Sequence, residues 1–252
     1  MQATNIDQVL AILASLIEDF KAQDSRLGFF AALYRQVTLE VQRGIERGFF
    51  ANGPRMDRFD TIFANRYLAA LDVFQSGGTP TRSWKVAFTA MEQPQEIILQ
   101  DLLVGINAHI NLDLSIAAAQ VAPGDAIQGL KGDFDKINQI LAALIQGVEA
   151  VISRFSPLIG LLEKVGGKDA AEVLHFSLDA ARQDAWTHAV ILAHQGPALQ
   201  ALTIEALDGK VSFLGRLIAN PAGLVGKAVD LIRQTESDDV PAIIDALNSV
   251  VH

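Results

Sequence analysis

Apolar residues recur at intervals of three and four along almost the whole chain, with polar residues between them. This spacing places the apolar side chains on one face of an α-helix and predicts amphipathic helices. The pattern is clearest in three segments, whose apolar residues are Ile6, Val9, Leu10, Leu13, Ile17 and Phe20, then Phe30, Leu33, Val37, Val41 and Ile45, then Ile137, Leu141, Leu144, Val148 and Val151. No segment shows the alternation of a half-buried strand. The sequence therefore predicts an all-α fold.

Glycine and proline residues interrupt these patterns at short intervals, for example in RGFFANGP (47–54), SGGTP (76–80) and HQGP (194–197). Such residues end helices and form turns. Their spacing predicts a multi-helix bundle of roughly nine to eleven helices joined by short connections. The widest break, residues 121–132, is interpreted as a loop within a single domain of residues 1–252, because no repeat or low-complexity linker divides the chain.

The composition excludes several classes of protein. Of the 252 residues, 50% are hydrophobic and 19% are charged, which indicates a folded chain with a sizeable core. There is no cysteine, so disulfides and thiolate chemistry are excluded, and any metal would need His, Asp, Glu or Asn ligands. The net charge of −9, without a local cluster of Lys and Arg, indicates that nucleic acid is not a partner.

The N-terminal residues and the length of the apolar runs favour a cytoplasmic protein. The start, MQATNIDQVLAILASLIEDFK, lacks a basic region and a small-residue cleavage site, so it is interpreted as a first helix and not as a signal peptide. No uncharged apolar run approaches the roughly 20 residues that cross a bilayer, so no transmembrane segment is expected. The apolar C-terminal part would also suit a homodimer contact.

One expected helix, from about Pro94 to Gln120, carries polar residues among apolar ones and is expected to be buried on all sides. His109 and Asp113 are four residues apart and share one face of it. Buried polar groups need partners, because an unpaired one costs roughly 1–3 kcal/mol. Two interpretations stay open: a structural pair, or a site in which His109 is a general base or a metal ligand and Asp113 its partner.

A second pair with the same spacing, His175 and Asp179, occurs in HFSLD. If the two helices face each other, His109, Asp113, His175 and Asp179 would form a site for a divalent metal such as Zn, Mn or Mg. A metal-bound water would favour hydrolysis of an ester or phosphoester. Pairs with this spacing also arise by chance, so a metal-free pocket is the alternative.

Further residues are candidates for the same pocket. In RMDRFDTIFANRYLAALDVF, Asp60 is a candidate catalytic residue, and Asn65 and Arg66 are candidates for substrate binding. Arg66 would either clamp an anionic group or form a buried ion pair. Asp133, directly after a glycine, is expected to cap the N-terminus of its own helix. The remaining candidates for substrate binding are Asn107, Asn138, Arg182 and the only two tryptophans, Trp84 and Trp186.

Several ordered motifs resemble those of an uncharacterised bacterial family, a domain of unknown function: FFAALYRQVTLEVQRGI, FANRYLAALD, SWKVAF, LLVGINAHINLDLSIAA, GDFDKIN and ARQDAW. The resemblance spans about residues 28–190, is most specific for NAHINLDL and FANRY, and implies a helical domain without an established activity. More distantly, the spacing of His109 and Asp113 is similar to a ligand pair of the all-helical zinc phospholipase C and P1 nuclease fold. That likeness implies zinc ligands there, but five histidines are too few for the full three-zinc site.

Together these patterns predict an enzyme that acts on a small, largely apolar metabolite, with chemistry centred on His109 and Asp113. With a metal the reaction would be hydrolysis, and without one it would be proton transfer in an isomerisation, lyase or cyclisation step. The 13 Phe residues would line an apolar pocket. The alternative is a non-enzymatic binding protein for an apolar ligand, in which the polar residues only organise the core.

Overall fold

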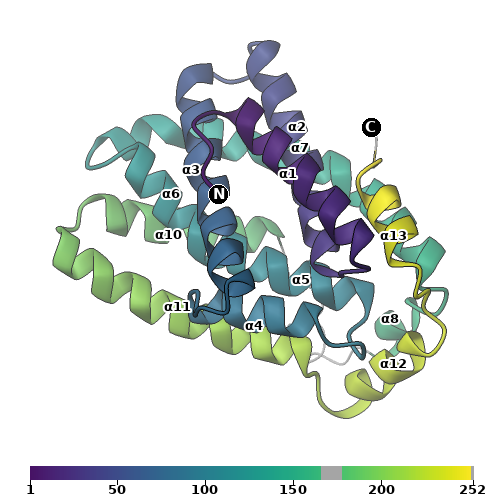
Figure 1. The fold of residues 1–252 in the computed structure, drawn as a ribbon. Coiled ribbons are helices and arrows are strands. Elements are labelled where there is room, and N and C mark those ends of the chain that lie inside the picture. Colours follow the sequence, from purple (N-terminus) through teal and green to yellow (C-terminus); the bar gives the residue numbers. More distant parts are fainter. Residues whose placement is uncertain (166–177, 251–252) are drawn as a thin grey trace.

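The computed structural model of the chain describes residues 1–165 and 178–250, without the side chain of Asp179. Within these residues there are helices and no strands, which confirms the predicted all-α fold (Figure 1). When the continuous helix from Ile98 to Val121 is counted once, the described part of the chain forms eleven helices, within the expected number. The single-domain organisation stays a prediction.

The helices follow one another through short connections, except across residues 166–177, which lie outside the described part of the chain. In chain order they are α1 (Ile6–Ala22), α2 (Leu27–Glu46), α3 (Gly53–Gln75), α4 (Arg82–Met91), α5 (Ile98–Ala108), the π-helix η1 (His109–Asp113), α6 (Leu114–Val121), α7 (Ala126–Phe155), α8 (Leu161–Val165), α10 (Leu178–Ala193), α11 (Pro197–Ala219), α12 (Gly223–Arg233) and α13 (Val240–Leu247). The first helix begins at Ile6, where the Asn5 side chain caps it by accepting a hydrogen bond from the Gln8 amide.

The central element is the run α5, η1 and α6, which forms one continuous helix over the segment predicted to be buried. Helices α2, α3, α4, α10 and α11 pack against it from different sides (Figure 1). Among the described residues it is the one helix long and apolar enough to cross a membrane, and 89% of its most apolar stretch is buried inside the protein. Core helices of soluble proteins share these properties.

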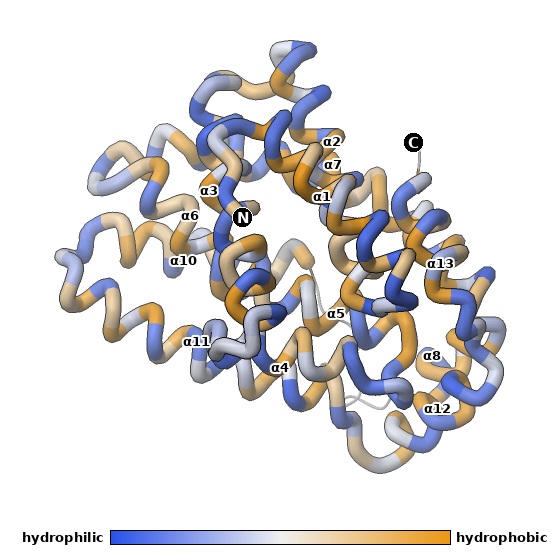
Figure 2. The backbone as a smooth tube through the Cα atoms, viewed as in Figure 1, coloured by the Kyte–Doolittle hydropathy of each residue, from blue (hydrophilic) through white to orange (hydrophobic). Residues whose placement is uncertain are grey.

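A glycine in this central helix brings α2 close to it. A side chain at Gly105 would place its Cβ 2.5 Å from the ring of Phe30 and 2.9 Å from the end of Met91, so only glycine fits. Phe30 can therefore lie against the central helix near His109. Figure 2 shows hydrophobic stretches along α5 and alternating hydrophobic and hydrophilic residues along the outer helices, as amphipathic packing requires.

Two local expectations differ from the structure. The break at 121–132 is shorter than expected, since α7 already begins at Ala126. Asp133 does not cap its own helix; it is buried within α7 and accepts hydrogen bonds from the backbone amides of Ala51 and Asn52, at 2.7 and 3.0 Å. Asp133 also pairs with Arg55, in the first turn of α3, at 3.1 Å, and with Lys136 of its own helix at 3.6 Å. The rule for capping is local in sequence and does not detect such a tertiary role.

Candidate functional site

A cavity of about 530 Å³ lies between the central helix and helices α2, α3, α7 and α10. Of the 25 described residues that line it, 20 are apolar, so a bound molecule would contact mostly hydrocarbon surface. The five polar lining residues are Tyr34, Asp60, His109, Glu149 and Arg182.

The cavity reaches the surface on one face of α7. Ala142, Ile145 and Glu149 line the cavity and are also exposed to solvent. Their spacing of three and four residues places them on a single stripe of the helix. We call these three residues the mouth of the cavity.

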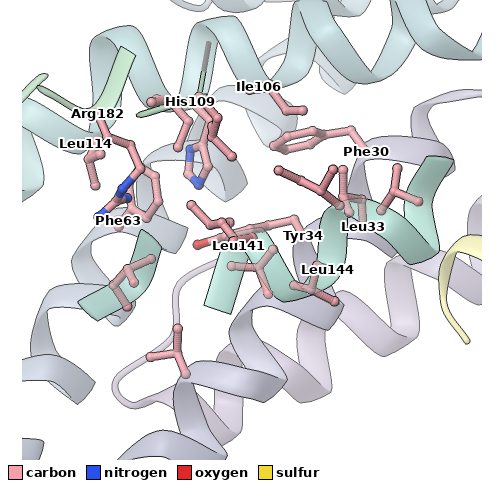
Figure 3. A pocket seen from close by; sticks show the side chains of 18 of the residues that line it. Phe30, Leu33, Tyr34, Phe63, Ile106, His109, Leu114, Leu141, Leu144 and Arg182 are labelled. Carbon is pink, nitrogen blue, oxygen red and sulfur yellow. The ribbon is translucent and has the colours of Figure 1, made fainter. Parts of the chain in front are cut away.

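His109 enters the cavity from the π-helical turn. In η1 the amide of Leu114 donates to the carbonyl of His109, five residues earlier, instead of the usual four. Such turns are rare and are frequently found at functional sites. Figure 3 shows the His109 ring pointing from this helix into the cavity, with Phe63 and Phe30 on either side.

One side of the His109 ring faces Asp113. The distance from Nδ1 of His109 to Oδ2 of Asp113 is 3.5 Å, and the carboxylate also accepts from Trp84 Nε1 at 2.7 Å and from Arg66 Nε at 2.6 Å. Burial raises the pKa of Asp113, but the charge of Arg66 and the hydrogen bonds outweigh burial and hold that pKa below its usual value. Because an ionised carboxylate only accepts, we assign the His109 proton to Nδ1, which leaves a lone pair on Nε2.

Aromatic rings surround the rest of the His109 side chain. Phe63 stacks on it with ring centroids 3.5 Å apart, and Tyr34 meets it edge-on at 4.5 Å. Burial in this cage lowers the pKa of His109, so the imidazole is neutral at neutral pH. Nε2 has no hydrogen-bond partner among the described residues.

Two further buried polar atoms in the cavity lining lack partners in the described part of the chain: Oδ2 of Asp60 and the hydroxyl of Tyr34. Burial, assisted by the charge of Asp57, raises the pKa of Asp60 to about 8, so its carboxyl group is protonated at neutral pH. Burial and the nearby Asp60 raise the pKa of Tyr34 well above its usual value. Three residues of the cavity lining therefore carry a buried polar atom without a partner in the described part of the chain, and each such atom costs roughly 1–3 kcal/mol unless a water or a ligand pairs with it.

Among the predicted site residues that lie outside the cavity lining, four hold other groups in place. Arg66 and Trp84 both bind Asp113. Asn65 accepts from the amide of Ala3 and donates to its carbonyl, at 2.8 and 2.9 Å, which fixes the N-terminal residues on α3. Asn107 donates to the carbonyl of Val211 at 2.9 Å and so attaches α11 to the central helix.

The remaining predicted residues form a group on α7 and α10. Arg182 lines the cavity and donates to Oδ1 of Asn138 and, at 2.6 Å, to the carbonyl of Phe134. Its guanidinium also lies 4.4 Å from the centre of the Phe134 ring. Asn138 and Trp186 are not in the cavity lining, and Trp186 packs against Phe134 with centroids 5.0 Å apart.

The proposed metal ligands are only partly described. His175 and the side chain of Asp179 lie outside the described residues. Within residues 1–165 and 178–250, no group of three or more His, Asp or Glu side chains is placed to hold a metal ion. Both oxygens of Asp113 already accept hydrogen bonds, one of them from a cationic guanidinium, which disfavours a second cation beside it.

The sequence analysis missed two polar residues of the lining, Glu149 and Tyr34. Tyr34 lies four residues after Phe30 and one after Leu33, on the apolar stripe that identified this helix. A tyrosine on such a stripe carries a hydroxyl into the core, so this pattern could have identified Tyr34 as a candidate from the sequence.

The chain belongs to the family of unknown function DUF5995, which it matches over residues 6–221. The matched range contains the central helix and every residue that lines the cavity, whereas α12 and α13 lie beyond it. No curated protein and no solved structure matches the chain. The likeness to the zinc phospholipase C and P1 nuclease fold therefore receives no support from a matching structure.

Proposed function

We propose that the protein is an enzyme that acts on a small, largely apolar metabolite by metal-free proton transfer, with His109 as the general base. One observation carries the proposal: the buried His109 ring is oriented by Asp113, lines an apolar cavity, and carries an Nε2 that has no partner among the described residues. A general base needs a lone pair at neutral pH, and burial provides it by lowering the pKa of His109.

Asp60 is the proposed acid. Its carboxyl group is protonated at neutral pH because its pKa is raised to about 8, so Asp60 gives a proton while His109 takes one. Removal of a proton at one substrate atom and its return at another are the steps that isomerisation and lyase reactions share. The Tyr34 hydroxyl, which lines the same cavity, would hold the reacting oxygen by a hydrogen bond.

Arg66 and Trp84 act through Asp113 and are positioning residues. They keep the carboxylate ionised and fixed, which keeps the proton of neutral His109 on Nδ1. When Nε2 accepts a proton, the same carboxylate stabilises the imidazolium that forms. Metal-dependent hydrolysis is less well supported, because a metal at Asp113 would have to displace these two donors.

A second candidate function is non-enzymatic binding of an apolar ligand. The observation that favours it is the lining itself, in which 20 of 25 residues are apolar. In that case the polar residues would orient the ligand and no bond would change.

Deuterium exchange separates the two functions without a known substrate. The protein is incubated in D₂O with a metabolite extract, and mass spectrometry identifies metabolites that gain deuterium or change composition. The test variant is His109→Asn, because the asparagine amide still donates toward Asp113 while the lone pair of Nε2 is removed. The control is His194→Asn, which changes an exposed histidine at the end of α10.

The proposal expects label or product with wild type and with His194→Asn, and a loss of at least about a hundredfold with His109→Asn. Equal activity of wild type and His109→Asn would refute the role of His109. No change in any metabolite, together with recovery of an unaltered bound ligand, would establish the binding protein instead.

The other expectations from the sequence stay predictions. These are the cytoplasmic location, the homodimer and the lack of a nucleic-acid partner. Size-exclusion chromatography with light scattering tests the homodimer directly.

A further inference from the structure

The polar atoms of the cavity set the hydrogen bonds that a ligand must make. Nε2 of His109 can only accept, whereas the Tyr34 hydroxyl and the protonated Asp60 carboxyl can both donate and accept. A ligand oxygen that donates to His109 and accepts from Tyr34 or Asp60 would pair these atoms. A hydroxyl group does both, and a carbonyl oxygen accepts from the two donors.

The charged groups near these atoms already have partners. Arg66 and Asp113 neutralise each other at 2.6 Å, outside the cavity lining. Arg182 is the cationic residue of the lining, and its guanidinium already donates to Asn138 and to the carbonyl of Phe134. A charged ligand group beside His109 would lose its hydration. The polar atoms there are neutral, so they could replace that hydration only with hydrogen bonds and not with an opposite charge.

The apolar lining continues from these atoms to the mouth on α7. Leu141, Leu144 and Val148 line this part of the cavity, and the exposed Ala142 and Ile145 stand at the surface. In Figure 3, Leu141 and Leu144 lie across the cavity from the His109 ring. A ligand that enters at the mouth would therefore place a hydrocarbon body against α7.

We infer that the cavity binds an uncharged hydrophobic molecule with one hydroxyl or carbonyl oxygen, which enters past Ala142 with the oxygen directed toward Tyr34, Asp60 and His109. This inference rests on the proposed function, since it names the substrate class of that same site. The class is defined by its chemistry: a hydrocarbon body, no net charge and a single polar end.

Three probes with the same chain length test the charge requirement on the wild-type protein: decanol, decanoate and decylammonium. Isothermal titration calorimetry at neutral pH measures their affinities. Decanol should bind at least about tenfold more tightly than either ion, because an ionic end beside His109 loses hydration that neutral hydrogen bonds there do not replace. Equal or tighter binding of decanoate would overturn the inference and assign Arg182 as an anion clamp. Failure of all three probes to bind would also overturn it.

Two tyrosine variants test the direction of the oxygen. Tyr34→Phe should weaken decanol binding about tenfold. The control Tyr67→Phe removes a hydroxyl from a buried tyrosine outside the lining and should leave the affinity for decanol unchanged. Unchanged affinity in a folded Tyr34→Phe variant would contradict the placement.

Two neighbouring residues of α7 test the route of entry. Ala142 lines the mouth, whereas Ala143 is exposed and is not in the lining. Ala142→Trp should block decanol binding, and Ala143→Trp should leave it intact; equal binding by both would refute this route. Decanol binding that follows all these expectations, without deuterium exchange in any extract, would uphold the ligand class and reject the proposed enzyme.

Discussion

The imidazole of His109 lies flat against the phenyl ring of Phe63, with 3.5 Å between ring centroids and 9° between their planes. The phenyl ring offers no hydrogen bond and excludes water from that face. The stack also fixes the rotation of the imidazole, so that Nδ1 stays near Asp113. Aromatic packing and the carboxylate thus determine together where the lone pair of Nε2 points.

The first prediction concerns the titration of His109. Burial lowers the pKa of His109 below 6.5, whereas hydrogen bonds to the Val190 carbonyl and to Asp125 raise the pKa of the exposed His194 above it. Below pH 6.5 the unfolded chain binds more protons at His109 than the folded chain, so the stability from this group is lost as the pH falls. NMR titration of the histidine ring signals checks the order, and a His109 that titrates above His194 would contradict it.

The second prediction concerns the Arg66–Asp113 ion pair. Arg66→Met should destabilise the protein by roughly 3 kcal/mol, because it leaves the buried Asp113 charge without its cation. The double variant Arg66→Met with Asp113→Asn removes that charge and should recover part of the loss. Urea unfolding of both variants measures the difference. A double variant less stable than Arg66→Met alone would show that charge compensation is not the cause.

The third prediction concerns the pH dependence that Asp60 gives to stability. The pKa of Asp60 is raised from 3.8 to about 8, so the folded chain binds more protons than the unfolded chain between these values. Stability from this group is therefore present at low pH and is lost as the pH rises to about 8. Over this pH range the free energy of unfolding of Asp60→Asn should rise relative to that of wild type by at least about 1.4 kcal/mol, the equivalent of one pKa unit.

Urea unfolding at a series of pH values measures that gain. Asp72→Asn, on the exposed surface of the same helix, controls for the change in net charge. A difference between Asp60→Asn and wild type that does not vary with pH would show that Asp60 is ionised in the folded protein.

The fourth prediction separates a ligand-binding hydroxyl from a structural donor. Tyr34→Phe removes an unpaired hydroxyl and should leave the melting temperature unchanged or raise it, since no hydrogen bond is lost. Trp84→Phe removes the indole N–H that donates to Asp113 at 2.7 Å, and should cost roughly 1–3 kcal/mol. Thermal unfolding of the ligand-free variants compares them. A strongly destabilised Tyr34→Phe would mean that the hydroxyl serves the fold.

The fold was accessible from the sequence because helical periodicity depends on neighbouring residues only. The stripe through Phe30, Leu33 and Val37 is such a pattern, and these residues do face the interior from α2. The pairing of His109 with Asp113 was accessible for the same reason, since residues four apart meet on a helix.

The partners of the other polar residues could not be inferred in this way. Asn65 binds Ala3 and Asn107 binds Val211, which lie 62 and 104 residues away in the chain. Both asparagines resemble site residues in the sequence, and only the tertiary packing shows that they join segments. The π-helical turn was equally hidden, because the residues HINLD suit an α-helix just as well.

That turn has a consequence for changes in chain length. A π-helical turn holds one residue more than the α-helical turn it replaces. Deletion of Ile110 would let the segment close into a regular helix, because the wide turn already absorbs the extra residue. The residues after the turn would keep their places, and Asp113 would stay near Arg66, three residues after His109 instead of four. The extra residue shifts the α-helical register of the sequence by one residue between α5 and α6, while the helix itself stays continuous.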